Sequence, residues 1–129
     1  MFRIERLDHV AFTARDIDGL AEWYTKVFGM ERVYAEAWSG RGDPVALCAG
    51  DACVALFRER GGAELVAEPA DPDPSRHFAM ALDRANFEQA QRDLQALGIE
   101  FRLRNHKVCD SLYLNDPEGH EIELTTYEV

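Results

Sequence analysis

The chain has 129 residues, 47% of them apolar, which is enough for one globular domain with its own core. Its formal net charge of −10 argues against nucleic acid and anionic membrane surfaces as partners, because both are bound through basic patches. No apolar run approaches the roughly 20 residues of a membrane span, and the first residues lack an apolar signal-peptide segment, so we expect a cytoplasmic protein.

The first half of the chain is expected to form one strand, one helix and three more strands. Asp16 is placed as an N-cap before apolar residues that recur at three- and four-residue steps, and Gly29 ends this helix. Gly50 and Asp51 separate two short apolar runs and predict a hairpin turn. The sequence thus predicts a strand at 4–14, a helix at 17–28, and strands at 30–38, 45–49 and 52–58.

The cysteine pattern gives no metal site. Cys48, Cys53 and Cys109 are odd in number and lack metal-ligand spacing. Cys48 and Cys53 flank the expected hairpin turn and could face each other across the strands. In a reducing cytosol, however, we expect all three to be free thiols.

The second half repeats the order of the first. Residues 59–75 are rich in Gly, Pro and charge, so about 60–75 is interpreted as a linker between the halves, with a loop over a site as the alternative. A strand is expected at 76–83, a helix ended by Gly98, and strands at 99–104, 107–115 and 120–127. One domain, 1–129, would then contain module 1 at about 4–59 and module 2 at about 76–128.

An internal duplication follows from the spacing of matching residues. His9 and His77 are 68 positions apart, and Gly29 and Gly98 are 69 apart, so the offset is nearly constant across strand and helix. The fold class is therefore predicted to be α+β, with each helix packed on one face of a mainly antiparallel sheet.

Three ligand-type side chains are expected on the sheet face away from the helices. Strand alternation places His9 and His77 there, next to small alanines, and Glu123 opposite Ile122 and Leu124. Each residue alone is more often a hydrogen-bonded or surface group than a ligand. Their coincidence at matching positions favours a facial site for Fe²⁺, Mn²⁺, Ni²⁺ or Zn²⁺ with positions left open for substrate.

Three motifs resemble the vicinal oxygen chelate superfamily, which includes glyoxalase, bleomycin resistance proteins and extradiol dioxygenases. They are Leu7-Asp-His-Val-Ala-Phe12, Trp23-Tyr-Thr-Lys-Val-Phe-Gly29 and Tyr113-Leu-Asn-Asp-Pro-Glu-Gly-His-Glu-Ile-Glu123, and the resemblance covers nearly the whole chain. It implies two tandem βαβββ modules forming an incomplete barrel around a metal and substrate cavity. His9, His77 and Glu123 then fall on three of four ligand positions, and the fourth, near Leu56 or Phe57, is apolar.

Tyr113 is the candidate for a catalytic role beside the metal. It is expected to point away from Leu112 and Leu114, which would place its hydroxyl over the site as a hydrogen-bond donor to a bound oxygen. The alternative is an aromatic wall residue. His106, in an expected turn, is either a proton shuttle or a surface histidine. Trp38, Phe57 and Arg102 are further candidates for the pocket wall.

The resemblance implies a metal-dependent enzyme acting on a small oxygenated substrate chelated through vicinal oxygens. An extradiol-dioxygenase-like reaction on Fe²⁺ is favoured, which would make the protein an oxidoreductase. A glyoxalase-like lyase and a fosfomycin-type thiol transferase are alternatives of the same class. A metal-free, bleomycin-resistance-like binding protein is the alternative of another class, and the charge of −10 suits its cationic ligands. A homodimer is expected from the resemblance.

Overall fold

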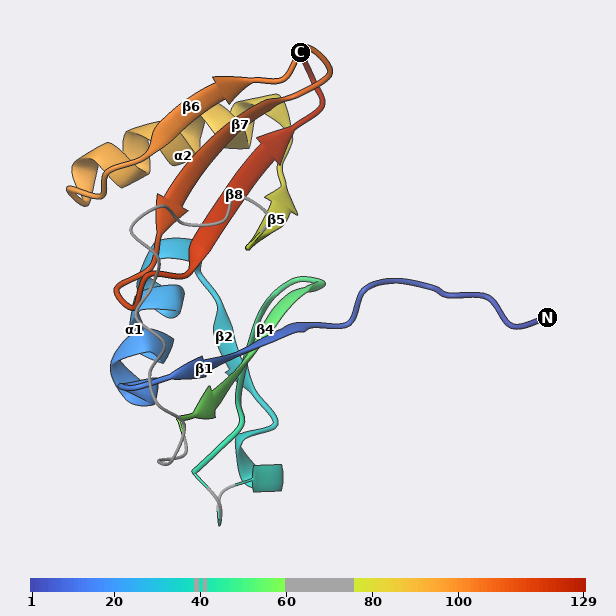
Figure 1. Cartoon of the computed structure of the whole chain (residues 1–129), viewed down its shortest axis with the longest axis vertical. Helices are drawn as coiled ribbons and strands as arrows, with labels where there is room; N and C mark the ends of the chain where they lie inside the picture. Colours follow the sequence, from blue (N-terminus) through green and yellow to red (C-terminus); the bar gives the residue numbers. More distant parts are fainter. Residues whose placement is uncertain (39, 41, 60–75) are drawn as a thin grey trace. The chain divides into compact units, whose positions relative to one another are not determined.

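The computed structural model describes residues 1–38, 40, 42–59 and 76–129. The chain divides into two compact units, Met1–Ala63 and Glu64–Val129. Each unit contains a strand, a helix and three further strands, so the expected pair of tandem βαβββ modules is confirmed. Figure 1 shows the course of the chain through both units. The expected linker at 60–75 lies outside the described residues. None of the described helices is long and apolar enough to cross a membrane.

The first unit is a four-stranded mixed sheet with one α-helix. Its elements are β1 (Val10–Ala14), α1 (Ile17–Phe28), β2 (Glu31–Val33), the 3-10 helix η1 (Ala35–Trp38), β3 (Val45–Ala49) and β4 (Ala52–Arg58). The strand order is β1-β4-β3-β2. β1 runs parallel to β4, and the other two pairings are antiparallel.

The second unit repeats this arrangement. Its elements are β5 (His77–Ala81), α2 (Arg84–Ala96), β6 (Arg102–Asn105), β7 (Asp110–Asn115) and β8 (Glu121–Thr126). The strand order β5-β8-β7-β6 matches that of the first sheet, again with one parallel and two antiparallel pairings. The two sheets are therefore mainly antiparallel, as predicted.

Helix α1 is delimited by side-chain and backbone caps. The Asp16 carboxylate accepts a hydrogen bond from the Gly19 backbone N–H at 3.0 Å, which satisfies one of the donors left open at a helix start. Gly29 ends the helix with a φ of 65°, a left-handed conformation that costs glycine little. The Tyr24 side chain is fully buried, and its ring centroid lies 5.9 Å from that of Phe12 on β1. This contact confirms that Phe12 faces the helix.

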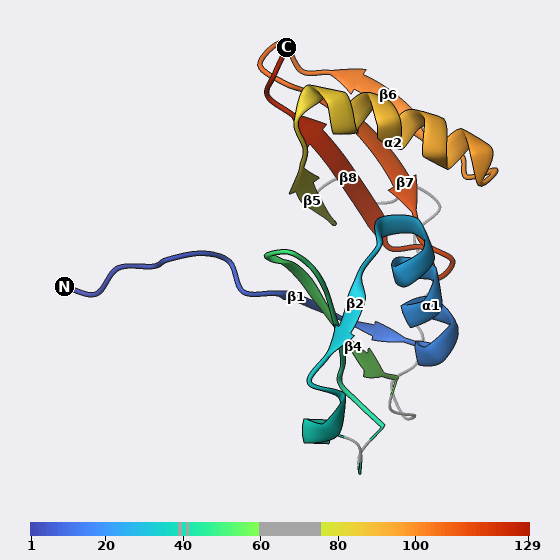
Figure 2. The same cartoon turned by 180° about the vertical axis from the view of Figure 1, so that it is seen from behind.

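Helix α2 covers one face of the second sheet, as the view from behind in Figure 2 shows. Asp83 caps it by accepting from the Asn86 N–H at 2.8 Å. Phe87 on α2 is buried, as are Ile122 and Leu124 on β8. Because residues alternate between the faces of a strand, Glu121, Glu123 and Thr125 must lie on the opposite face. This packing leaves that face for polar side chains.

Strand β1 begins later than the sequence predicts. The expected strand at 4–14 is observed only at Val10–Ala14. β1 pairs with β4 alone, and Val10 lies opposite Val54 in that register. Only two residues of β4 precede Val54, so residues before position 8 have no β4 residue opposite them. Leu7, expected in the strand, is accordingly exposed.

The strand expected at 30–38 is also shorter than predicted. β2 ends at Val33, and Tyr34 has a φ of 56°, which is left-handed and does not continue an extended strand. The chain then enters η1, where the ring of Trp38 meets that of Tyr34 edge-on at 6.2 Å. Trp38 thus packs on its own local segment.

The expectation of free thiols is wrong for two of the three cysteines. Cys48 and Cys53 lie directly opposite each other on β3 and β4, with Cα atoms 4.2 Å apart, and form a disulfide. The two-residue turn at Gly50 and Asp51 sets this register, which brings their side chains to one face. Cys109 is a free, buried thiol, as expected.

Truncating a core residue of the second sheet should destabilise the protein. Leu112 on β7 is fully buried, whereas Leu103, its partner on β6, is 52% exposed. We expect Leu112→Ala to lower the free energy of unfolding by about 2–5 kcal/mol. The matched control Leu103→Ala should cost much less, since its side chain loses little burial. Urea unfolding followed by circular dichroism measures both, and equal losses would contradict the described core.

Candidate functional site

The candidate site lies on the polar face of the second sheet, opposite α2. The strand register places Tyr113 on β7 beside Glu123 on β8, and Ala79 on β5 on the other side of Glu123. Arg102 on β6 lies beside Tyr113. Side chains from four strands therefore meet on one face, and the small Ala79 leaves space next to the carboxylate.

Glu123 is held at both carboxylate oxygens. Its Oε2 lies 3.0 Å from Nε2 of His77, and its Oε1 accepts a hydrogen bond of 2.6 Å from the Ser111 hydroxyl. Ser111 is fully buried, and the Glu123 side chain is only 12% exposed. A carboxylate this deep needs such partners, because burying an unpaired charge is costly. The predicted neighbours His77 and Glu123 are thus brought together.

Tyr113 lies against this pair. Its ring meets that of His77 edge-on with centroids 5.8 Å apart, and its hydroxyl is 2.9 Å from Nε2 of His106. Burial raises the pKa of the Tyr113 phenol, and the charge of nearby Glu123 raises that pKa further. The phenol is therefore protonated at neutral pH and able to donate a hydrogen bond. The position agrees with the one expected from strand alternation.

Two supporting contacts were not foreseen from the sequence. Ser111 shares the face of Tyr113 by alternation, but only the register shows that its hydroxyl reaches Glu123. His106 follows β6, where Lys107 adopts a left-handed φ of 70° and the His106 N–H bonds to the Cys109 carbonyl. This turn directs the His106 ring to Tyr113. No feature of sequence alone specifies that direction.

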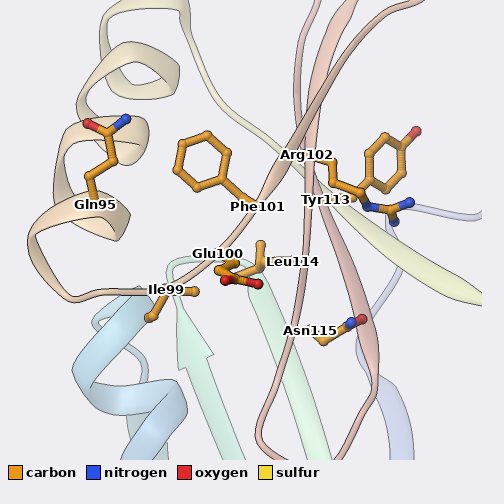
Figure 3. A pocket seen from close by; sticks show the side chains of 8 residues that line it. All are labelled: Gln95, Ile99, Glu100, Phe101, Arg102, Tyr113, Leu114 and Asn115. Carbon is orange, nitrogen blue, oxygen red and sulfur yellow. The ribbon is translucent and has the colours of Figure 1, made fainter.

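A cavity of about 630 Å³ adjoins Tyr113 (Figure 3). Its lining residues come from the end of α2, the segment leading into β6, the first residue of β6, and β7: Gln95, Ile99, Glu100, Phe101, Arg102, Tyr113, Leu114 and Asn115. Figure 3 shows Arg102 beside Tyr113, with Phe101 directed toward α2. The Arg102 guanidinium lies 5.8 Å from the centre of the Tyr113 ring and 2.7 Å from Glu121. Of the three expected wall residues, Arg102 lines this cavity.

His9 belongs to the first unit and just precedes β1. Its Nδ1 lies 2.8 Å from Oδ2 of Asp8, and this bond is the main cause that lowers the pKa of the Asp8 carboxyl. The second ring nitrogen, Nε2, takes no part in that bond. A histidine oriented by a carboxylate through one nitrogen is the usual arrangement of a metal-binding imidazole.

The donor atoms fit a divalent metal ion. Two donor atoms that each lie about 2.1 Å from an ion, with a right angle between their bonds at the ion, are about 3 Å apart. The distance between His77 Nε2 and Glu123 Oε2 is 3.0 Å. Nitrogen and oxygen donors of this kind suit Fe²⁺, Mn²⁺, Ni²⁺ and Zn²⁺. Within the described residues, three or more such side chains are not gathered into one metal-binding group. His77 and Glu123 form a pair in the second unit, and His9 is in the first.

The duplicated register identifies the fourth matching position. In the first unit Ala11 pairs with Ala55, and in the second unit the matching Ala79 pairs with Glu123. Ala55 in β4 therefore corresponds to Glu123 in β8. The sequence placed this position near Leu56 or Phe57. Leu56 is fully buried on the helix face and cannot serve. The corresponding residue, alanine, carries no ligand atom either.

His120 supports the turn before β8. Its Nδ1 lies 2.7 Å from Oδ2 of Asp116, whose Oδ1 accepts from the N–H groups of Glu118 and His120. The fully buried Asp116 side chain thus ties the Asp-Pro-Glu-Gly turn together. His120 thus makes a structural contact with the turn.

Comparisons with known proteins find similar proteins along nearly the whole chain. The family model of the Glyoxalase/Bleomycin resistance protein/Dioxygenase superfamily matches residues 6–124. Fosfomycin resistance protein FosX of Mesorhizobium japonicum is 30% identical, covering 95% of this chain and 86% of the relative. Metallothiol transferase FosB of Bacillus licheniformis is 24% identical, covering 98% and 79%. The crystal structure of lactoylglutathione lyase from Agrobacterium tumefaciens superimposes with a TM-score of 0.72 at 23% identity, covering 97% and 96%.

The environment of Tyr113 predicts its titration. Because its pKa is raised, we expect the phenol to lose its proton at higher pH than the ordinary value of 10.0. Ultraviolet absorbance titration of wild type minus Tyr113→Phe isolates this group, and Tyr127→Phe, which removes a 68% exposed tyrosine, is the control. Glu123→Gln should lower the Tyr113 pKa by removing the neighbouring charge. An unchanged value would contradict the described contact.

Proposed function

Because the chain belongs to the Glyoxalase/Bleomycin resistance protein/Dioxygenase superfamily, we propose that it is a divalent-metal-dependent enzyme acting on a small oxygenated molecule. The observation that carries the proposal is the half-buried pair of His77 and Glu123, with the carboxylate held by Ser111. A binding protein without a metal has no need of a carboxylate fixed beside an imidazole.

His9, His77 and Glu123 are the proposed metal ligands. Asp8 orients the His9 ring, and Ser111 orients the Glu123 carboxylate, so both ligands have a partner that fixes their direction. Once bound, the ion acts as a Lewis acid for two adjacent substrate oxygens. Fe²⁺ is the favoured ion, with Mn²⁺, Ni²⁺ and Zn²⁺ as alternatives.

Tyr113 and His106 are the proposed acid–base residues. The protonated Tyr113 hydroxyl donates to a substrate oxygen, and His106, in contact with that hydroxyl and exposed, exchanges the proton with solvent. This arrangement suits a reaction in which a substrate hydroxyl changes its protonation state. An extradiol-dioxygenase-like cleavage of a catechol is such a reaction, and it is the leading proposal.

Opening of an anionic epoxide is the second candidate. It is supported by the 30% identity to a fosfomycin resistance protein over 95% of this chain and by the match to a metallothiol transferase. The strand register also puts Arg102 and Arg104 on the face that carries Tyr113 and Ser111. Guanidinium groups suit a phosphonate, although Arg102 is already paired with Glu121 on this face.

Metal content is the first test of the proposed site. Protein purified without a chelator or histidine tag should carry about one divalent ion per chain. His77→Ala and His9→Ala should lose it, since each removes one of three ligands, whereas the control His106→Ala should retain it. Elemental analysis measures all four proteins. No metal in the wild type, even after reconstitution, would contradict the proposal and favour a metal-free drug-binding protein.

Two assays separate the reactions. An oxygen electrode with Fe²⁺-loaded protein and catechols tests ring cleavage, and phosphorus NMR of fosfomycin, with and without a thiol, tests epoxide opening. For the reaction observed, Tyr113→Phe should lower kcat about 10²- to 10⁴-fold by removing the proton donor, while Tyr127→Phe should not. The expected homodimer is checked on the same samples by light scattering.

A further inference from the structure

We propose that Cys48 and Cys53 form a reversible redox pair whose oxidation state changes how His9 binds a metal ion. The first part concerns a modification site on the β3–β4 hairpin. The second part rests on the proposed metal site, and the experiments below keep the two apart.

The hairpin, rather than the disulfide, holds the two sulfur atoms close. Cys48 and Cys53 are directly opposite, five positions apart in sequence, across a two-residue turn. The neighbouring pair Leu47 and Val54 is buried, so the hairpin keeps its packing when the bond opens. A bond that closes so short a loop also restricts the unfolded chain less than one that closes a long loop. The pair can therefore be reduced and reoxidised within the folded protein.

The pair is also within reach of small redox molecules. Cys48 and Cys53 are both partly exposed, whereas Cys109 is buried and remains a free thiol. Exposed disulfides are the ones that exchange readily with thiols. In a reducing compartment, disulfides are usually transient and serve catalysis or redox sensing. This reconciles the disulfide in the structure with a composition that predicts free thiols.

The oxidation step balances with a peroxide as the oxidant. One thiolate attacks hydrogen peroxide, giving a sulfenic acid and releasing hydroxide, which takes up the proton of that thiol to become water. The second thiol then displaces the sulfenic hydroxyl as another water molecule and forms the sulfur–sulfur bond. Two electrons pass from the cysteines to the peroxide. Reduced glutathione reverses the step by thiol–disulfide exchange through a mixed disulfide.

The register connects this pair to His9. Strand β1 pairs with β4 from Val10 and Val54 onward, so His9 lies one position before the first pair, level with Cys53. His9 and Cys53 also share the face opposite α1, because both alternate with residues on the helix side. The disulfide ties the start of β4 to the end of β3 at this level. With the bond open, the buried pair of Leu47 and Val54 still holds the body of the hairpin, but the turn end beyond it, which is level with His9, becomes freer. A less fixed ligand binds more weakly.

Thiol counting tests the redox pair. Under denaturing conditions, alkylation and mass spectrometry should find one free thiol, Cys109, after hydrogen peroxide treatment and three after incubation with excess reduced glutathione. Circular dichroism should show the native fold in both states. In Cys109→Ser, the number of free thiols should still differ by two between the peroxide and glutathione treatments. In Cys48→Ser and in Cys53→Ser, this difference of two should be absent. A disulfide that resists glutathione, or thiols that resist peroxide, would overturn the redox pair.

Manganese binding tests the connection to His9. Mn²⁺ prefers oxygen and nitrogen donors to thiolates, so its affinity reports on the proposed ligands and not on the free cysteines. By electron paramagnetic resonance, the oxidised protein should bind Mn²⁺ about threefold or more tightly than the reduced protein. Cys53→Ser should remove the difference, and Cys109→Ser should keep it.

The two proposals fail in different ways. Equal Mn²⁺ affinity in both oxidation states would overturn the connection to His9 while leaving the metal site intact. No Mn²⁺ binding in either state would instead overturn the proposed metal site, and with it the second part of this inference. The thiol counts need no metal, so they decide the first part in every case.

Discussion

The polar side chains on one face of the second sheet are arranged around one largely buried carboxylate. Glu123 lies in the middle of β8, between the apolar residues Ile122 and Leu124, where an unpaired charge would be expensive. The Ser111 hydroxyl and the His77 ring satisfy it, and each of these groups comes from a strand directly paired with β8. The pairing register of β5, β7 and β8 therefore determines whether the Glu123 carboxylate meets its two partners. A shift by one residue would turn Glu123 into the core.

The sequence was most informative where a local signal is sufficient. The hairpin of β3 and β4 was predicted at its observed bounds, because a turn of glycine and aspartate separates two apolar runs. The first helix was predicted from its Asp16 cap and its apolar spacing, and the second from Gly98 at its end. Asp83 caps the second helix but was not recognised from the sequence. Strand alternation likewise placed His77 and Glu123 on one face, which the structure confirms in the second unit.

The sequence was less informative where partners distant along the chain decide the outcome. The start of β1 is set by where β4 begins, and the end of β2 by the left-handed Tyr34, and neither has a distinct local pattern. The contact of His106 with Tyr113 requires a particular turn conformation. An assumed reducing cytosol led to the prediction that Cys48 and Cys53 are free thiols. Their directly opposite positions on β3 and β4 instead bring them together in a disulfide.

The broken symmetry of the two units has an electrostatic consequence. Ala55 occupies the position in β4 that corresponds to Glu123, so the duplicated fold supplies a carboxylate from one unit only. A divalent ion held by two neutral imidazoles and one carboxylate would keep one net positive charge, and a second carboxylate would cancel it. A surplus positive charge attracts ionised oxygens such as those of a catecholate or a phosphonate. In the proposed metal site, the missing carboxylate would thus favour anionic ligands despite the strongly negative charge of the whole chain.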